Sequence, residues 1–235
     1  MNLDKLAAAF WRDGYLLLKD FFAPTLMDAY QQLIVEHFKN APDFLHNEEF
    51  LQKSATDVIP WFPQQSGFDV FDIVEDNTNL QAITTAILGH GWNGLYCMTM
   101  FSGKGTKGQA WHQDCAPENP AKFNLNRLVY TDDINANSGG QVVVIPASHL
   151  KGEISIGDIN EDLVDQLIIA PSKGDLLLLH GHVWHRVLPI NKRFRVSTNY
   201  RCCPNGTPDD ITNVCVYRNM RYRFDTSEVV ENRLS

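Results

Sequence analysis

Hydrophobic residues in the first 90 positions recur mostly with the period of an α-helix. The first stripe has the spacing i, i+3, i+4, i+7 and is made by Leu3, Leu6, Ala7 and Phe10. Gly14 then predicts a break before a short apolar strand over residues 15–18. Pro24 suits the first turn of a second helix with its own apolar stripe. Asn77 and Gly89 have the residue types that begin and end a third helix.

From position 92 onward the pattern changes to short apolar strands separated by Gly, Pro and Asn. The expected strands cover residues 94–101, 109–114, 123–131, 141–145, 153–156, 175–180, 183–188, 194–202 and 213–219. Strands at this density predict a mainly β fold, with a double-stranded β-helix core (a cupin-like jelly roll) and N-terminal helices packed on one sheet. We expect one domain over 1–235, with a helical part and lid segment over 1–91 and the jelly-roll core over 92–219.

Composition and charge narrow the class of protein. The 235 residues are 44% hydrophobic and 20% charged, as in an ordinary globular protein. A net charge of −8 argues against a nucleic-acid-binding surface. No apolar run approaches the roughly 20 residues that span a bilayer, and the start lacks the pattern of a signal peptide. We therefore expect a cytoplasmic protein without a membrane partner. The five cysteines form no CxxC pair and are expected to be reduced and buried.

One His-x-Asp pair lies on an expected strand. Residues i and i+2 of a strand point to the same face, so His112 and Asp114 can bind one metal ion. A chain of this composition supplies such a pair by chance, and the pair alone is weak support. A similar pattern, His46-Asn47-Glu48, lies in the irregular, aromatic-rich segment 40–72 and is interpreted as surface.

A facial metal triad needs a second histidine from elsewhere in the chain. Three candidates follow one apolar strand, namely His180, His182 and His185. The next strand carries Arg195 and Ser197, which share a face because they are two residues apart. An arginine can bind a carboxylate in bidentate fashion, and a serine can add a hydrogen bond. The residues alone leave the choice among the three histidines open.

The order of these motifs resembles a known family. The chain has His112-Gln113-Asp114, then an Asn-Ser-Gly-Gly turn over 137–140, then a histidine and an arginine on successive strands. This order, and the opening over 14–22, resembles the phytanoyl-CoA dioxygenase-like iron(II)/2-oxoglutarate-dependent oxygenases, from about residue 10 to about residue 202. The resemblance implies that iron(II) is the cofactor and that 2-oxoglutarate is the co-substrate.

The family pattern can be carried over position by position. His112 and Asp114 match the first two iron ligands. The family's distal histidine precedes the co-substrate arginine by 10 to 11 residues, which selects His185 before Arg195. Arg195 then matches the arginine that binds the far carboxylate of 2-oxoglutarate. Met100 aligns with a residue that contacts the co-substrate.

Two positions depart from the family pattern. The family often has a small hydroxyl residue two positions after the distal histidine, where this chain has Val187, and Ser197 is expected to supply that hydrogen bond. Val129 stands where the family has tryptophan. Arg127, two residues earlier, is a guess for a residue that faces the pocket and holds a substrate carboxylate. His149 and His182 are interpreted as structural, and Trp111, Trp184 and Met98 as core in the first instance.

The resemblance implies an enzyme, a dioxygenase that consumes O2, releases succinate and CO2, and most often hydroxylates a C–H bond. The segment 40–72 and the tail after Cys203 are expected to cover the mouth of the barrel. No basic patch suited to coenzyme A stands out, which favours a small, free metabolite as the substrate. Two alternatives stay open: a cupin-type metal-dependent dioxygenase or isomerase without 2-oxoglutarate, and a non-catalytic ligand-binding relative. The sequence predicts no oligomeric state.

Overall fold

The computed structural model describes residues 1–39, 44–224 and 228–233. Its helices are α1 (Leu3–Asp13), α2 (Pro24–Lys39), α3 (Glu48–Ser54), α4 (Asp72–Glu75) and α5 (Thr78–Leu88), with short 3-10 turns η1 (Asp69–Phe71) and η2 (Ser148–Leu150). Its strands are β1 (Tyr15–Leu18), β2 (Ile59–Trp61), β3 (Asn93–Gly103), β4 (Gln109–Gln113), β5 (Leu125–Val129), β6 (Val142–Val144), β7 (Leu167–Ile169), β8 (Leu176–His180), β9 (His185–Val187), β10 (Phe194–Cys203), β11 (Val214–Tyr217), β12 (Met220–Arg223) and β13 (Glu228–Val230).

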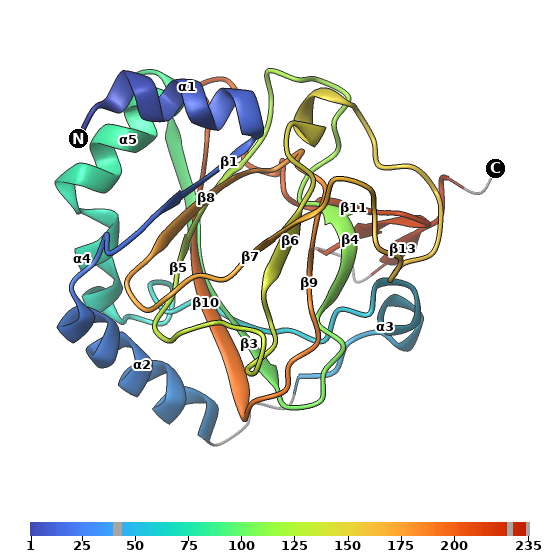
Figure 1. Cartoon of the computed structure of the whole chain (residues 1–235), viewed down its shortest axis with the longest axis horizontal. Helices are drawn as coiled ribbons and strands as arrows, with labels where there is room; N and C mark the ends of the chain where they lie inside the picture. Colours follow the sequence, from blue (N-terminus) through green and yellow to red (C-terminus); the bar gives the residue numbers. More distant parts are fainter. Residues whose placement is uncertain (40–43, 225–227, 234–235) are drawn as a thin grey trace.

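The strands form two antiparallel sheets that face each other. One sheet has the order β1-β8-β5-β10-β3-β2, and the other has the order β13-β12-β11-β4-β9-β6-β7. Successive strands after β3 mostly alternate between the sheets, which is the winding of a double-stranded β-helix. The predicted fold class is therefore confirmed. Figure 1 shows the helices α1, α2, α4 and α5 lying along the six-stranded sheet, away from the other sheet.

The N-terminal helices begin and end where their capping residues allow. The Asn2 side chain accepts a hydrogen bond from the Lys5 amide at the start of α1, and Asn77 does the same for two amides of α5. Gly14 ends α1 with a φ of 78°, a left-handed conformation that glycine adopts without strain. The helices pack their apolar stripes on the six-stranded sheet, through residues such as Tyr30 and Ile83.

The strand β8 is an almost continuous run of apolar residues in the sequence, and its packing explains why. Leu176 and Leu178 pack among the helices, whereas Leu177 and Leu179 pack against the facing sheet. Both faces of β8 are therefore buried, and alternate residues enter two different cores. The side chains of β10 alternate in the same way, and this alternation determines which of them reach the space between the sheets.

Several predicted elements differ from the structure. The predicted strand over 153–156 is wrong, because this segment is irregular, and the strand that pairs with β6 is β7. The segment 40–72 contains α3, β2, η1 and the start of α4 rather than being irregular throughout. Residues 40–43 of that segment and residues 225–227 and 234–235 of the tail lie outside the described residues. None of the helices in the described ranges is long and apolar enough to cross a bilayer.

Candidate metal centre

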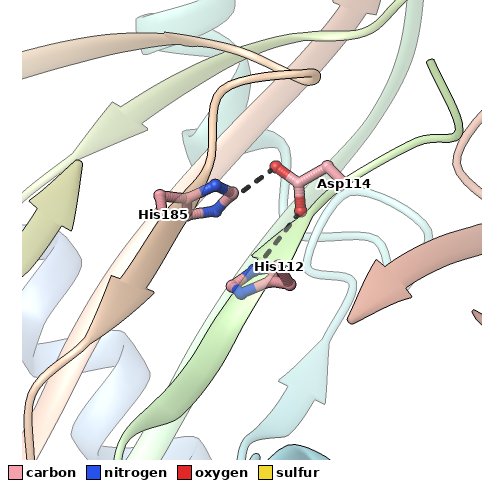
Figure 2. A group of neighbouring side chains, drawn as sticks. All are labelled: His112, Asp114 and His185. Carbon is pink, nitrogen blue, oxygen red and sulfur yellow. Dashed lines mark ion pairs between the residues drawn. The ribbon is translucent and has the colours of Figure 1, made fainter. Parts of the chain in front are cut away.

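Two neighbouring strands bring His112, Asp114 and His185 together. His112 lies near the end of β4, and Asp114 follows that strand directly. His185 is the first residue of β9, and the antiparallel register pairs it directly with His112. Figure 2 shows the three side chains converging between the strands. All three residues are buried, and their potential ligand atoms lie within 4.8 Å of one another. Neither His180 nor His182 belongs to this group.

The two imidazoles are held in one tautomer by backbone carbonyls. His112 Nδ1 lies 2.8 Å from the carbonyl oxygen of Ala110, and His185 Nδ1 lies 2.9 Å from that of Val183. Because each Nδ1 must donate its proton there, each Nε2 keeps a free lone pair. These Nε2 atoms lie 3.9 Å and 3.7 Å from the carboxylate oxygens of Asp114, too far for hydrogen bonds. The three groups thus present three donor atoms to one point.

The Asp114 carboxylate is oriented by a donor on each oxygen. Asn126 Nδ2 donates to one oxygen at 2.7 Å, and Arg201 Nη2 donates to the other at 2.9 Å. Burial by itself would raise the pKa of Asp114, but Arg201 and the two imidazoles outweigh it and lower that pKa to about 2. Asp114 is therefore an anion at neutral pH. Arg201 also donates to Tyr96 Oη at 2.7 Å and to Asn126 Oδ1 at 3.0 Å.

The donor set fits a divalent iron ion. Burial, and then the neighbouring His185, lower the pKa of His112 to about 3, so His112 is neutral and able to bind a metal. The two imidazoles and the one carboxylate form the two-histidine, one-carboxylate set that binds non-haem iron and leaves positions for further ligands. Hydrogen bonds to the far side of each ligand are also what a metal site requires.

Arg195 and Ser197 lie on the face of β10 that points between the sheets. Arg195 Nη1 donates to Ser197 Oγ at 3.0 Å, and Arg195 Nε donates to the Gly140 carbonyl at 2.8 Å. A side chain at Gly140 would come within 2.6 Å of Arg195 Cδ, which explains the glycine of the Asn-Ser-Gly-Gly turn. Burial lowers the pKa of Arg195, and no carboxylate in the described part of the chain pairs with it. A buried cation in this state is a receptor for an anion.

One small cavity joins the metal triad to Arg195. This inner cavity has a volume of about 40 Å³, and the residues that line it include His112, Asp114, His185, Arg195, Ser197, Met100, Gln109, Asn126, Leu179 and Val187. Met100 lies opposite Ser197 in the register of β3 and β10. The structure therefore brings together all six residues that the sequence selected: the three candidate ligands, Arg195, Ser197 and Met100.

A larger cavity of about 440 Å³ lies next to it. This outer cavity is bounded by segment 44–62, by β3 and by segment 212–224, and it reaches His112 and Asp114 at its inner end. Tyr96, Met98 and Met100, which share one face of β3, all line it. Segments 44–62 and 212–224 therefore enclose the space beside the triad. His46 lines this cavity, and its Nε2 lies 2.7 Å from the Val58 carbonyl, so it is not a simple surface residue.

Arg127 does not face the pocket, contrary to the interpretation from the sequence. It faces the helices, not the cavity, and its guanidinium donates to Glu75 Oε1 at 2.7 Å and to the Tyr200 carbonyl at 2.8 Å. The next residue back, Asn126, faces the cavity in its place. Trp111 and Trp184 lie outside both cavities and donate to the carbonyls of Glu161 and Gly152, respectively.

Sequence reasoning missed four polar residues of the site, three of which bond one another. Asn126, Asn199 and Arg201 form one hydrogen-bonded group, in which Asn126 Oδ1 accepts from the other two side chains. Asn199 and Arg201 lie four and six residues after Arg195, so strand alternation alone could have found them. Gln109 was missed for a different reason: a register shift in β4 between Gln109 and His112 breaks the alternation, and Gln109 lines both cavities.

Known structures share this fold. The 2-oxoglutarate-dependent epimerase SnoN from nogalamycin biosynthesis is 16% identical, with a TM-score of 0.67 over 92% of this chain and 85% of that one. HygX from Streptomyces hygroscopicus, crystallised with nickel and 2-oxoglutarate, is 15% identical, with a TM-score of 0.66 over 86% and 87%. The carbocyclase SnoK is 13% identical, with a TM-score of 0.67 over 91% and 85%. At these identities the likeness concerns the fold alone.

A sequence comparison identifies the family. No curated protein matches the chain significantly. The family model described as phytanoyl-CoA dioxygenase (PhyH) matches residues 10–191, which is most of the chain and includes His112, Asp114 and His185. The chain therefore belongs to the phytanoyl-CoA dioxygenase family, and it is a 2-oxoglutarate-dependent dioxygenase of the non-haem iron class.

Proposed function

We propose that this enzyme hydroxylates an unactivated C–H bond of a small-molecule metabolite. Each turnover converts the C–H bond to C–OH, consumes one O2, and splits 2-oxoglutarate into succinate and CO2. The observation that carries the proposal is the inner cavity, in which the buried triad and Arg195 face one space, and Arg195 pairs with no carboxylate of the described residues. A dicarboxylate that chelates a metal at one end and meets a cation at the other matches this arrangement.

In this proposal His112, Asp114 and His185 hold iron(II). The chemistry that bound iron supplies is activation of O2 at the expense of 2-oxoglutarate. The task of the chain is to keep the three donors fixed and correctly protonated. The carbonyls of Ala110 and Val183 fix the imidazoles, and Asn126 and Arg201 fix the carboxylate.

Arg195 and Ser197 would bind the far carboxylate of 2-oxoglutarate. The Arg195 guanidinium is already fixed by Gly140 and Ser197, so little side-chain entropy is lost when the anion binds. Met100, opposite Ser197, would contact the carbon chain of the co-substrate. The outer cavity would hold the metabolite, since it reaches His112 and Asp114 from the other side.

The first test is succinate formation from 2-oxoglutarate in the presence of iron(II) and O2. We expect the wild-type protein to form succinate, and we expect Asp114→Ala to abolish it together with tight iron binding, because the triad loses its only anionic donor. Asp209→Ala, which removes an exposed carboxylate far from Asp114 in the sequence, is the matched control. Unchanged succinate formation by Asp114→Ala would overturn the proposal.

The product decides between hydroxylation and other outcomes of the same chemistry. The neighbours SnoN and SnoK are described as an epimerase and a carbocyclase, so this fold supports more than one outcome. For an identified substrate, a gain of one oxygen atom from O2 supports hydroxylation, and a product without it contradicts that part of the proposal. Iron-dependent turnover without any 2-oxoglutarate would instead favour a cupin-type enzyme.

A further inference from the structure

We infer that the substrate is an uncharged, largely apolar ring compound with a hydroxyl or carbonyl oxygen, and that it occupies the outer cavity. The inference rests on the proposed function, because it assigns the substrate class of the same site. The volume of about 440 Å³ lies in the lower half of the range of pockets that enclose drug-sized molecules, roughly 300–1,000 Å³. The substrate is therefore a compact molecule rather than a macromolecule or a long conjugate.

The walls of the outer cavity are mostly apolar and aromatic. Phe62 packs edge-on against Tyr96, with ring centroids 5.6 Å apart, and Met98 lies beside Tyr96 on the same face of β3. Tyr217 and Tyr222 line the opposite side. Rings of a ligand gain both apolar burial and favourable ring-to-ring geometry against such walls. A methionine among them adapts its shape to the ligand.

The charges in the cavity are already matched. Among the described lining residues, the only carboxylate, lysine or arginine side chains are those of Asp114 and Arg201, which pair at 2.9 Å. Each of the three guanidinium nitrogens of Arg201 already donates a hydrogen bond, to Asp114, Tyr96 and Asn126. A charged group on the substrate would therefore meet no unpaired carboxylate, lysine or arginine in the described lining, which makes its burial unfavourable. This observation favours an uncharged substrate.

The rim of the cavity argues against a coenzyme A thioester. Phe44 and Leu45 from one segment and Phe224 from another line the rim, with 41%, 95% and 49% of their surfaces exposed. The phosphates of a coenzyme A group need lysine or arginine contacts. No lysine, and no arginine besides Arg201, lines the described part of this cavity. An apolar rim instead suits the entry of an apolar ring system.

Gln109 supplies the polar contact at the inner end. Its side chain lines both cavities, because the register shift in β4 turns it toward the same space as His112. The hydroxyls of Tyr96 and Thr212 bond each other, as do those of Thr56 and Tyr217. The Gln109 amide has no side-chain hydrogen bond to another described residue. An amide can accept from a hydroxyl or donate to a carbonyl, so it selects for an oxygen near the reacting carbon.

The test uses three probes that share one ring system and differ in charge. They are 9-anthracenemethanol, 9-anthracenecarboxylate and protonated 9-anthracenemethylamine, whose binding to the iron- and 2-oxoglutarate-loaded protein without O2 is followed by fluorescence anisotropy. We expect the neutral alcohol to bind at least about tenfold more tightly than either charged probe. Equal or tighter binding of the carboxylate or the ammonium, or no binding of the alcohol, overturns the inference.

Matched variants locate the binding site. Phe62→Ala removes a wall of the cavity and is expected to weaken binding of the alcohol about tenfold, whereas Phe68→Ala, which removes a ring that packs on Trp61 outside the cavity, leaves it unchanged. Gln109→Leu is expected to weaken the alcohol two- to tenfold and to leave unsubstituted anthracene unaffected. Equal effects of the two phenylalanine variants would place the probe elsewhere and overturn the inference.

The two proposals fail in different ways. Anaerobic addition of 2-oxoglutarate to the iron-loaded protein produces a visible charge-transfer absorption when both bind, whether or not a probe is present. If this absorption forms and the alcohol does not bind, the substrate class is wrong and the proposed function stands. If the alcohol binds selectively and the absorption never forms, the proposed function is wrong. A thermal unfolding scan of each variant shows that lost binding is not lost folding.

Discussion

The two faces of the six-stranded sheet are built from alternate residues of the same strands, and they serve different ends. On β10, Arg195, Ser197, Asn199 and Arg201 point between the sheets, whereas Val196, Tyr200 and Cys202 pack against the helices. One face therefore contributes the polar atoms of the site and the other contributes the hydrophobic core. A sheet can hold a reactive site rigidly on one face because its other face is tightly packed.

Each face of the sheet carries a buried arginine, and the two arginines differ in their partners. Arg127 lies toward the helices with Glu75 at 2.7 Å, the Tyr200 carbonyl at 2.8 Å and the ring of Trp92 at 5.1 Å. Arg195 lies toward the cavity and has no carboxylate partner in the described ranges. The paired arginine belongs to the stability of the fold, and the unpaired one marks a place for a ligand.

The largest expected effect is on the cavity face. Arg195→Leu should weaken binding of 2-oxoglutarate about a hundredfold to a thousandfold, because the far carboxylate would be buried without its cation. Anaerobic titration of the iron-loaded variant with 2-oxoglutarate measures this. Arg195→Lys keeps the charge but loses the bidentate geometry, and it should bind with intermediate affinity. Equal affinity of the wild type and Arg195→Leu would show that the co-substrate does not use this residue.

The helix face should respond in stability rather than in ligand binding. Glu75→Leu leaves Arg127 buried without its anion and should lower the free energy of unfolding by about 2–3 kcal/mol, less than for a fully buried pair because Glu75 is 26% exposed. Urea unfolding measures the loss, and Glu75→Gln, which keeps an oxygen acceptor, should lose less. Iron and 2-oxoglutarate affinities should stay at wild-type values. A fall in either affinity would show that the two faces are coupled.

Strand alternation made much of this arrangement predictable. It placed His112 with Asp114, and Arg195 with Ser197, on shared faces, and the same rule extends from Arg195 to Arg201. Alternation divides the side chains of a strand between two faces, but it does not show which face points into the cavity. Arg127 is for this reason only a guess for a residue facing the cavity, and the structure places it toward the helices. Apolar residues occur on both faces of this sheet, so hydrophobicity could not decide.

Irregular features could not be predicted in the same way. The register shift that turns Gln109 inward adds a residue between two ordinary strand positions, and no turn residue marks it. The outer cavity is formed by segments 44–62 and 212–224, which are far apart in the sequence. The sequence predicts that these regions cover the mouth of the barrel, but it does not predict which of their side chains line the cavity. Their positions depend on long-range packing, such as that of Phe50 on Tyr222 with ring centroids 4.1 Å apart. Sequence patterns report local periodicity and not such contacts.

The hydrogen bonds behind the metal ligands should matter next. Asn126→Leu removes the donor to Asp114 Oδ2 and the acceptor for Arg201 Nε, and it should weaken iron(II) binding about tenfold to a hundredfold. Asn124→Leu is the matched control, since Asn124 donates only to Asn126 and does not touch Asp114. Anaerobic iron titration of both variants compares them. Equal losses would mean that packing of the asparagine cluster, and not orientation of the carboxylate, governs iron affinity.

The smallest expected effect tests the departure at Val187. This side chain lines the inner cavity two residues after His185, where the family pattern described above implies a small hydroxyl residue. Val187→Thr keeps the shape and adds one hydroxyl, which should tighten 2-oxoglutarate binding about two- to tenfold if it reaches the carboxylate beside Arg195. Anaerobic titration measures the change, and Val142→Thr, on the neighbouring strand and lining the same cavity, is the control. An unchanged or weaker affinity for Val187→Thr would mean that Ser197 and Arg195 already satisfy that carboxylate.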